Sequence, residues 1–125
     1  MEFFAEFDGE LTAERLQSDI QIEDIPRYCS FVSEIRPNDD LGLEMLSFWG
    51  VHSVHREAIR GGLRFTLPGC PNVLSWTITT GLPPVLENVV VHCVINRKEH
   101  DPDFLESLEG FVDDWLTGLK SLYQA

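Results

Sequence analysis

The sequence predicts a single α+β domain over residues 1–125, in which an antiparallel or mixed sheet of four to six strands packs against a long C-terminal amphipathic helix and a short N-terminal helix. Two patterns carry this prediction. Short segments rich in β-branched and aromatic residues alternate with turn residues through most of the chain. Residues 102–123 then carry one apolar stripe at helical spacing. A length of 125 residues fits one such domain.

The N-terminal part of the chain is expected to form a strand, a helix and a second strand. Residues 2–7 contain three phenylalanines in weak alternation, which is typical of a strand. Residues 11–20 have apolar side chains at near-helical spacing, and Pro26 ends that element because the residue before a proline avoids the helical conformation. Residues 27–35 are rich in aromatic and β-branched residues and predict a strand, which the turn-forming residues 37–40 end.

Residues 41–60 fit two structures. Their apolar side chains recur on one helical face, with Asp40 as the N-cap and Gly61–Gly62 as the C-terminal stop, so a helix is favoured. Gly50 opposes a helix, because glycine in a helix interior costs about 1 kcal/mol relative to alanine. The alternative is a hairpin that turns at Gly61–Gly62.

The remaining sheet strands are easier to place. Residues 63–67 and 73–80 flank a loop rich in proline and glycine, which predicts a hairpin. Residues 88–97 form a nearly continuous apolar run, as expected of a central strand that is buried on both faces.

The C-terminal helix has a complete start signal. Asp101 is the expected N-cap, and Pro102 takes the first helical position, where proline is well tolerated. The stripe behind this start consists of large apolar side chains: Phe104, Leu108, Phe111, Trp115, Leu119 and Leu122. Such a helix is expected to pack on the sheet.

Acidic residues are concentrated at the two ends of the chain. The protein has 21 acidic and 9 basic residues, giving a net charge of −12. Residues 1–24 hold eight acids and one base, residues 25–98 hold six acids and seven bases, and residues 99–125 hold seven acids and one base. This balance excludes a nucleic-acid binder that works by neutralising phosphates.

No segment has the pattern of a targeting or membrane-spanning sequence. Acidic residues interrupt the N-terminus, and the best apolar run, residues 89–95, contains His92 and falls far short of the ~20 residues that a spanning helix needs. The three cysteines, Cys29, Cys70 and Cys93, are an odd number without regular spacing, which argues against a disulfide framework. We therefore expect a cytoplasmic protein that does not bind membranes.

No residue pattern marks an active site. His52 and His55 lack the further ligands that a zinc site needs, so no metal is expected. Cys70 lies in a loop whose prolines and glycine are explained by turn geometry, and neither a nucleophile elbow nor a phosphate-binding glycine loop is present. The sequence favours a non-enzymatic role without a cofactor.

The charge distribution predicts a binding role. An acidic adaptor, inhibitor or escort would engage a basic partner protein through carboxylates, which raise association rates and select partners by charge. The expected acidic residues are Glu106, Glu109, Asp113 and Asp114 of the C-terminal helix. Arg56 and Arg60 belong to a local basic cluster, and we also expect them to bind an acidic group of the partner. The alternative is that they pair with acidic residues of the same chain.

The last strand and the acidic helix behind it resemble the end of small acidic secretion chaperones. The resemblance covers less than a third of the chain and implies a homodimer that shields another protein. A homodimer surface is also one interpretation of the large number of aromatic residues, since interfaces are enriched in them.

The alternative function belongs to another class. A helix-grip-like domain, whether a binding protein or an enzyme, would hold a small molecule in a cavity between the sheet and the C-terminal helix. The residues expected to line this cavity are Trp49, Trp76, His92 and Trp115.

Overall fold

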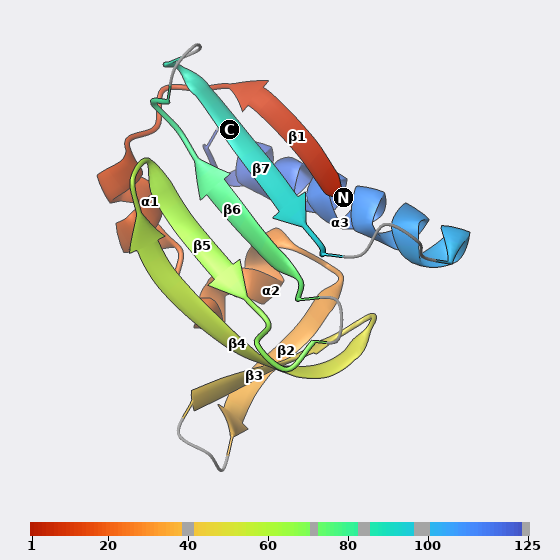
Figure 1. Cartoon of the computed structure of the whole chain (residues 1–125). Coiled ribbons are helices and arrows are strands. Elements are labelled where there is room, and N and C mark those ends of the chain that lie inside the picture. Colours follow the sequence, from red (N-terminus) through yellow and green to blue (C-terminus); the bar gives the residue numbers. More distant parts are fainter. Residues whose placement is uncertain (39–41, 71–72, 83–85, 97–100, 124–125) are drawn as a thin grey trace.

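The computed structural model describes residues 1–38, 42–70, 73–82, 86–96 and 101–123. One antiparallel sheet has its inner face covered by the helix α3 (Pro102–Tyr123) and by the short helices α1 (Ala13–Asp19) and α2 (Ile25–Tyr28) (Figure 1). The expected α+β class is confirmed. The sheet formed by the described residues has seven strands, more than the four to six expected.

The chain runs through the elements in a simple order. It begins with β1 (Glu2–Asp8) and passes through α1, a short 3₁₀ turn η1 (Ile22–Asp24) and α2. The strands that follow are β2 (Val32–Asn38), β3 (Gly42–Ser47), β4 (Gly50–Ile59), β5 (Gly62–Thr66), β6 (Ser75–Thr79) and β7 (Asn88–Val94). Each of these strands pairs with the next, and α3 ends the described chain.

The first two strands of the sequence lie at opposite edges of the sheet. The strand order is β1-β7-β6-β5-β4-β3-β2, so β1 pairs with the last strand, with Glu2 opposite Val94 and Asp8 opposite Asn88. The segment containing α1, η1 and α2 carries the chain from one edge to the other. These helices contact β5, β6 and β2, and α2 also contacts α3.

An aromatic layer lies between the middle of the sheet and α3. Phe65 and Trp76 project from β5 and β6, and Phe111 and Trp115 project from α3; all four are fully buried. Ring centroids lie 5.0 Å apart for Trp76 and Phe111 and 6.0 Å apart for Phe65 and Trp115. Burial of each such side chain contributes about 1.5–3 kcal/mol, and α3 also packs against β1 and β7.

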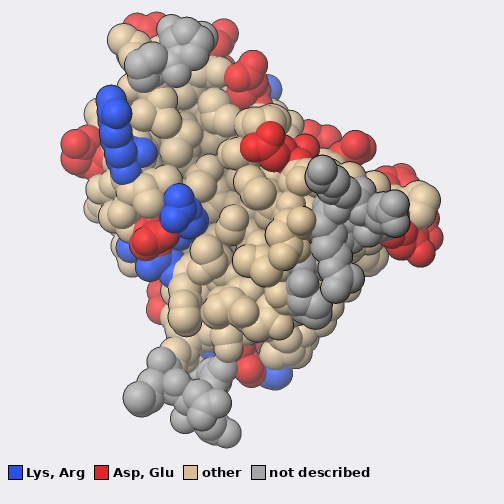
Figure 2. Space-filling view, viewed as in Figure 1, with Lys and Arg blue, Asp and Glu red and all other residues tan. Residues whose placement is uncertain are grey.

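The outer face of the sheet is largely uncharged, as Figure 2 shows for the side seen in Figure 1. Strand β7 was expected to be buried on both faces, and this is wrong. Val91 and Cys93 are buried on its inner face, whereas Val90, His92 and Val94 are only half-buried. Phe4 of β1 stacks on His92 with centroids 4.2 Å apart, yet remains 60% exposed. None of the described helices covers this face, so β7 keeps one partly solvated side.

Helix α3 has the bounds that the sequence predicts. Asp101 caps its N-terminus, because the Asp101 Oδ1 atom accepts a hydrogen bond of 2.9 Å from the Asp103 N–H. Near its other end the helix approaches α2 closely: a Cβ atom on Gly118 would lie 2.1 Å from the carbonyl oxygen of Tyr28. Only glycine permits this approach.

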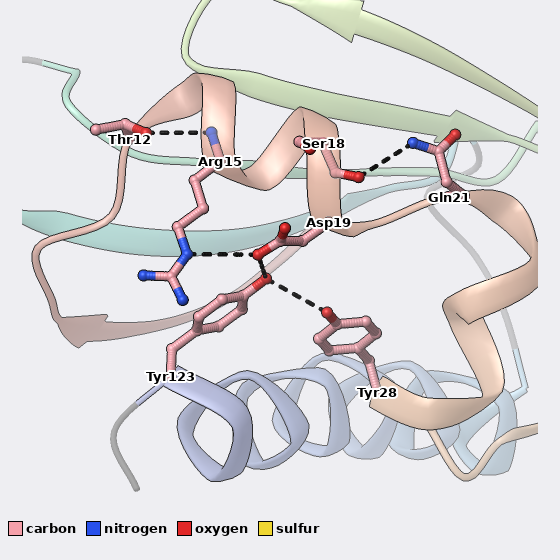
Figure 3. A network of polar contacts seen from close by, with 7 residues as sticks. All are labelled: Thr12, Arg15, Ser18, Asp19, Gln21, Tyr28 and Tyr123. Atoms are coloured by element: carbon pink, nitrogen blue, oxygen red, sulfur yellow. Dashed lines mark hydrogen bonds and ion pairs between the residues drawn. The ribbon is translucent and has the colours of Figure 1, made fainter.

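A polar network ties the C-terminal end of α3 to α1 and α2 (Figure 3). The Tyr123 hydroxyl donates to Asp19 Oδ2 at 3.0 Å and lies 3.3 Å from the Tyr28 hydroxyl. Asp19 also accepts from Arg15, whose guanidinium lies 5.0 Å from the centroid of the Tyr123 ring. Burial and the hydrogen bonds to Tyr28 and Asp19 raise the pKa of Tyr123. This end of α3 is therefore anchored by polar as well as apolar contacts.

The favoured helix over residues 41–60 is wrong. The described part of this segment forms β3 and β4, joined by a turn, and β4 then pairs with β5 through a turn at residues 60–61. The alternative hairpin at Gly61–Gly62 is thus close to the observed one. Gly50, the residue that opposed a helix, has a φ of +112°, a conformation that other residues rarely adopt. Asp40, the expected N-cap, lies outside the described residues.

The other elements agree with expectation, with one further correction. Strand β1, helix α1 and the β5–β6 hairpin are confirmed within residues 2–8, 13–19 and 62–79. The strand expected over residues 27–35 starts later, because α2 extends to Tyr28 and β2 begins at Val32 and continues through Pro37. Proline is tolerated there because β2 is an edge strand.

Candidate functional site

Two aromatic residues form the turn between β3 and β4. Phe48 and Trp49 are its central residues, where asparagine, aspartate or glycine is usual. The Phe48 N–H donates to the Phe31 carbonyl at 2.8 Å, and the Trp49 N–H donates to the Ser47 hydroxyl at 3.2 Å. Phe48 is nevertheless 75% exposed. A turn built against local preference, with a large apolar side chain in solvent, is a feature typical of functional sites.

The turn forms one wall of a groove of about 760 Å³ against the first turns of α3. In Figure 1 the yellow β3–β4 turn lies on the same side of the molecule as the light-blue N-terminal end of α3. The aromatic lining consists of Phe31, Phe48, Trp49 and Phe104. A Cβ atom on Gly110 would lie 3.0 Å from Phe31 Cζ, so this glycine allows the Phe31 ring to lie against the helix.

The Trp49 ring is held in a fixed position in this groove. Its Nε1–H donates to Ser107 Oγ at 2.8 Å, and the Ser107 hydroxyl donates to the Phe104 carbonyl at 2.6 Å. The ring also packs 5.0 Å from Phe111, centroid to centroid, which connects the groove to the buried aromatic layer. Because the indole N–H is already used, Trp49 offers the groove its ring surface.

Four carboxylates of α3 line the other side of the groove: Asp103, Glu106, Glu109 and Asp113. They are exposed and follow one another at three- and four-residue intervals, so they share one side of the helix over about 15 Å. Within the described residues no ion pair joins them to a basic side chain. By contrast, Asp19, Asp24, Glu44 and Glu57 each pair with an arginine.

The structure brings some of the expected partner-binding residues together and separates others. Glu106, Glu109 and Asp113 all line the groove. Asp114 is directed elsewhere, since its Oδ2 atom accepts from both the N–H and the hydroxyl of Ser30.

The two expected arginines lie outside the groove. The Arg56 guanidinium donates to the carbonyls of Gln17 and Ile20 at the end of α1, so it has a structural role. Arg60 is exposed at the far end of β4 from Phe48, and β4 spans about 30 Å.

Three of the four residues expected to line an inner cavity do converge. Trp76 and Trp115 lie in the aromatic layer with centroids 6.3 Å apart, and Trp49 reaches the same layer through Phe111. His92 lies on the outer face of the sheet, where its Nε2 atom is 3.1 Å from Glu2 Oε1. The indole N–H groups of Trp76 and Trp115 are buried and donate to no acceptor among the described residues.

The cysteines and histidines form no catalytic cluster in the described part of the chain. Cys29 and Cys93 are buried, and burial raises the pKa of both thiols, that of Cys93 to about 12, so both stay protonated. Within the described ranges no three His, Cys, Asp or Glu side chains are placed to hold a metal ion. No described helix combines the length and the apolarity needed to cross a membrane.

Among the aromatic residues of the groove, sequence reasoning assigned a binding role only to Trp49, for an inner cavity, and missed Phe31, Phe48 and Phe104. Phe31 directly precedes β2 and Phe104 lies in α3; both are far from Phe48 in the sequence, and only the fold brings them together. The available signal was local: an aromatic pair directly before Gly50, which is easily read as part of a helical stripe.

Comparison with known proteins identifies the fold alone. No family model matches the sequence, and no curated protein is significantly similar to it. Two structures of similar fold come from bacilli: an uncharacterised protein from Bacillus thuringiensis (TM-score 0.66, 9% identity, covering 100% of both chains) and the protein XoxI from Bacillus cereus (TM-score 0.66, 10% identity, 98% of this chain and 95% of that chain). A third is a START superfamily protein from Mycobacterium smegmatis (TM-score 0.57, 11% identity, 98% of this chain and 97% of that chain).

Proposed function

We propose that this protein is a non-enzymatic binding module that holds a positively charged segment of a partner protein in the groove between α3 and the β3–β4 turn. The observation that carries the proposal is the position of Phe48. This side chain is 75% exposed at the tip of a turn and lines the same groove as Glu106, Glu109 and Asp113, carboxylates that form no ion pair with a described basic side chain.

An exposed aromatic wall supports binding because a partner that covers it removes a large apolar surface from water, which is favourable. Removal of one large apolar side chain from water contributes about 1.5–3 kcal/mol. Interface centres are enriched in aromatic residues, and a polar, solvent-accessible rim surrounds them. The Phe31, Phe48 and Trp49 rings beside the carboxylates of α3 have this arrangement.

The charge of the molecule supports a basic partner. A net charge of −12 steers positively charged molecules toward the surface and speeds their association. The carboxylates of β1 do not extend the acidic rim: Glu2 and Glu6 lie on the outer face, where they contact His92 and Asn88. The groove thus concentrates negative charge that the described basic side chains do not neutralise.

Selection from a random peptide library tests the proposal. The immobilised protein is expected to enrich peptides that combine lysine or arginine with an apolar residue. Phe48→Ser should abolish this enrichment, whereas Phe4→Ser should not, because Phe4 is the matched control: an exposed phenylalanine on the opposite side of the sheet. Enrichment that Phe48→Ser leaves unchanged would rule out the groove as the binding site.

A second function, binding of a small apolar molecule between the sheet and α3, is favoured by one specific observation. The buried N–H groups of Trp76 and Trp115 have no described acceptor, and a buried donor without a partner costs about 1–3 kcal/mol. A ligand oxygen would satisfy them. The similarity in fold to a START superfamily protein also supports ligand binding.

Native mass spectrometry of the purified protein tests this second function. A bound small molecule should add a discrete mass that is lost in a Trp76→Phe variant, which keeps most of the ring volume and removes the N–H donor. A protein of unmodified mass that also takes up no apolar probe such as 1-anilinonaphthalene-8-sulfonate would exclude this function.

A further inference from the structure

We infer that the groove is selective for arginine over lysine, so that the partner segment is anchored by guanidinium groups that stack on its aromatic wall. This inference rests on the proposed function and adds the chemistry of the ligand. It follows from the combination, in one groove, of ring surfaces and of carboxylates that no basic side chain of the described ranges engages.

The aromatic wall determines which cation fits. The ring centroids of Phe48 and Trp49 lie 5.8 and 6.0 Å from that of Phe31. The three rings form a continuous surface without a free hydrogen-bond donor, since the Trp49 indole N–H is bonded to Ser107. A guanidinium is planar and weakly hydrated, and it stacks on such rings, whereas the compact ammonium of lysine is strongly hydrated. The wall therefore favours a flat cation.

The carboxylates determine how that cation is held. A guanidinium that lies on the wall has its N–H groups at its edge, and these can donate two parallel hydrogen bonds to one carboxylate. Glu106, Glu109 and Asp113 line the opposite side of the groove and are not engaged by any basic side chain of the described chain. Their side chains are available to accept those bonds.

The length of the acidic row indicates more than one arginine. Asp103 and Asp113 are ten residues apart on α3, which corresponds to about 15 Å. One guanidinium cannot reach both. A partner with two arginines four residues apart in an extended segment, about 13 Å, would match the row.

A comparison of two peptides of equal charge tests this inference. The probes are hexa-arginine and hexa-lysine, both acetylated at the N-terminus and amidated at the C-terminus, titrated at physiological salt and followed by tryptophan fluorescence. Trp49 is half-buried in the groove, while Trp76 and Trp115 are fully buried, so Trp49 should dominate the response. We expect the arginine peptide to bind at least about fivefold more tightly, given the stacking contribution.

Variants separate the two halves of the site. Phe48→Leu keeps an apolar side chain at an exposed position and removes a ring, so it should reduce the preference for arginine more than the affinity for lysine. Glu106→Gln with Glu109→Gln should weaken both peptides. Glu14→Gln with Glu23→Gln is the matched control, because it removes the same charge from positions elsewhere on the surface and should change neither peptide by more than about twofold.

The outcomes distinguish this inference from the proposed function. Equal affinity for the two peptides, with both weakened by the Glu106 and Glu109 substitutions, overturns arginine selectivity and leaves a basic-segment site. Failure of both peptides to bind at any salt concentration overturns the proposed function as well. A preference for arginine that Phe48→Leu does not reduce, with the Phe48→Leu protein folded by circular dichroism, also overturns stacking on this wall.

Discussion

Replacement of Gly118 by alanine is expected to separate α2 from α3. A Cβ atom at this position would lie 2.1 Å from the Tyr28 carbonyl oxygen and 2.8 Å from the Tyr28 carbonyl carbon and Cα. These are backbone atoms, so no side-chain rotation relieves the contact. Restoring an ordinary separation of 3.4 Å requires α2 to move away by about 1.3 Å. That movement disturbs the stacking of Tyr28 on Trp115, whose centroids are 5.6 Å apart.

The magnitude follows from three contributions. Overpacking of this kind costs about 1–3 kcal/mol, the weakened aromatic pair adds about 0.5–1.5 kcal/mol, and alanine regains about 1 kcal/mol of helix propensity. We expect a net loss of about 2 kcal/mol, or a decrease in Tm of roughly 7 °C for a chain of this length.

Gly110→Ala is the control, because it has the same propensity gain on the same helix. Its Cβ would meet only the end of the Phe31 side chain, at 3.0 Å, so its net effect should stay within about 1 kcal/mol. Urea unfolding followed by tryptophan fluorescence measures both variants. A Gly118→Ala protein as stable as the wild type, with an unchanged m-value, would refute the close approach of α2 and α3.

Three further predictions concern stability. In the unfolded chain the thiols lose their protons above pH 9.0, whereas buried Cys29 and Cys93 keep theirs, so the contribution of these thiols to stability is fully present below pH 9 and is lost as the pH rises, by up to about 1.4 kcal/mol per pH unit for each thiol. Cys93→Ala should therefore reduce the slope of unfolding free energy against pH, measured by urea titrations across roughly pH 8 to 10.5, and an identical slope would contradict the assignment. Tyr123→Phe removes the bond to Asp19 and should cost about 1 kcal/mol in the same assay at neutral pH, with no loss arguing that the network of Figure 3 is unimportant for stability. Asp101→Ala should lower stability by about 1 kcal/mol through loss of the N-cap, and Asp101→Asn should restore most of it; a failure of the asparagine variant to do so would exclude capping as the cause.

Elements with strong local signals were predictable from the sequence. Helix α3 has its cap, its proline and its apolar stripe within one segment, so its bounds follow from local chemistry alone. The β5–β6 hairpin likewise has its turn residues between two strand-forming segments. In each case the local preference and the final fold agree.

Strands β3 and β4 were not predictable because few of their side chains are buried, so the apolar alternation that marks a strand is weak. Of the residues in β3 and β4, Met45 and Val54 are buried, and each strand is held by backbone pairing to β2 or β5. Their connecting turn contains Phe48 and Trp49 in place of turn-forming residues, so the usual hairpin signal is missing. The same residues that hid the hairpin form the wall of the groove.

Of the candidate site, the acidic side was predictable from the sequence and the aromatic side was not. The acidic side of the groove comes from one helix, where Glu106, Glu109 and Asp113 share a face by simple periodicity. The aromatic side combines the residue before β2, a turn and the helix, and no local pattern links these segments. The arginines were misplaced because the carbonyl acceptors of Arg56 lie at the end of α1, which the sequence does not place beside β4.

The pairing of β1 with β7 has a consequence for synthesis of the chain. Residues 2–8 pair with residues 88–94, so during synthesis β1 cannot form these backbone hydrogen bonds until residues 88–94 have emerged from the ribosome. During that time a segment with three phenylalanines is exposed, and such segments aggregate readily. Glu2, Glu6 and Asp8 alternate with its more buried side chains and act as gatekeepers of the nascent chain. The carboxylates of β1 are therefore placed to oppose aggregation of this segment, while those of α3 line the groove.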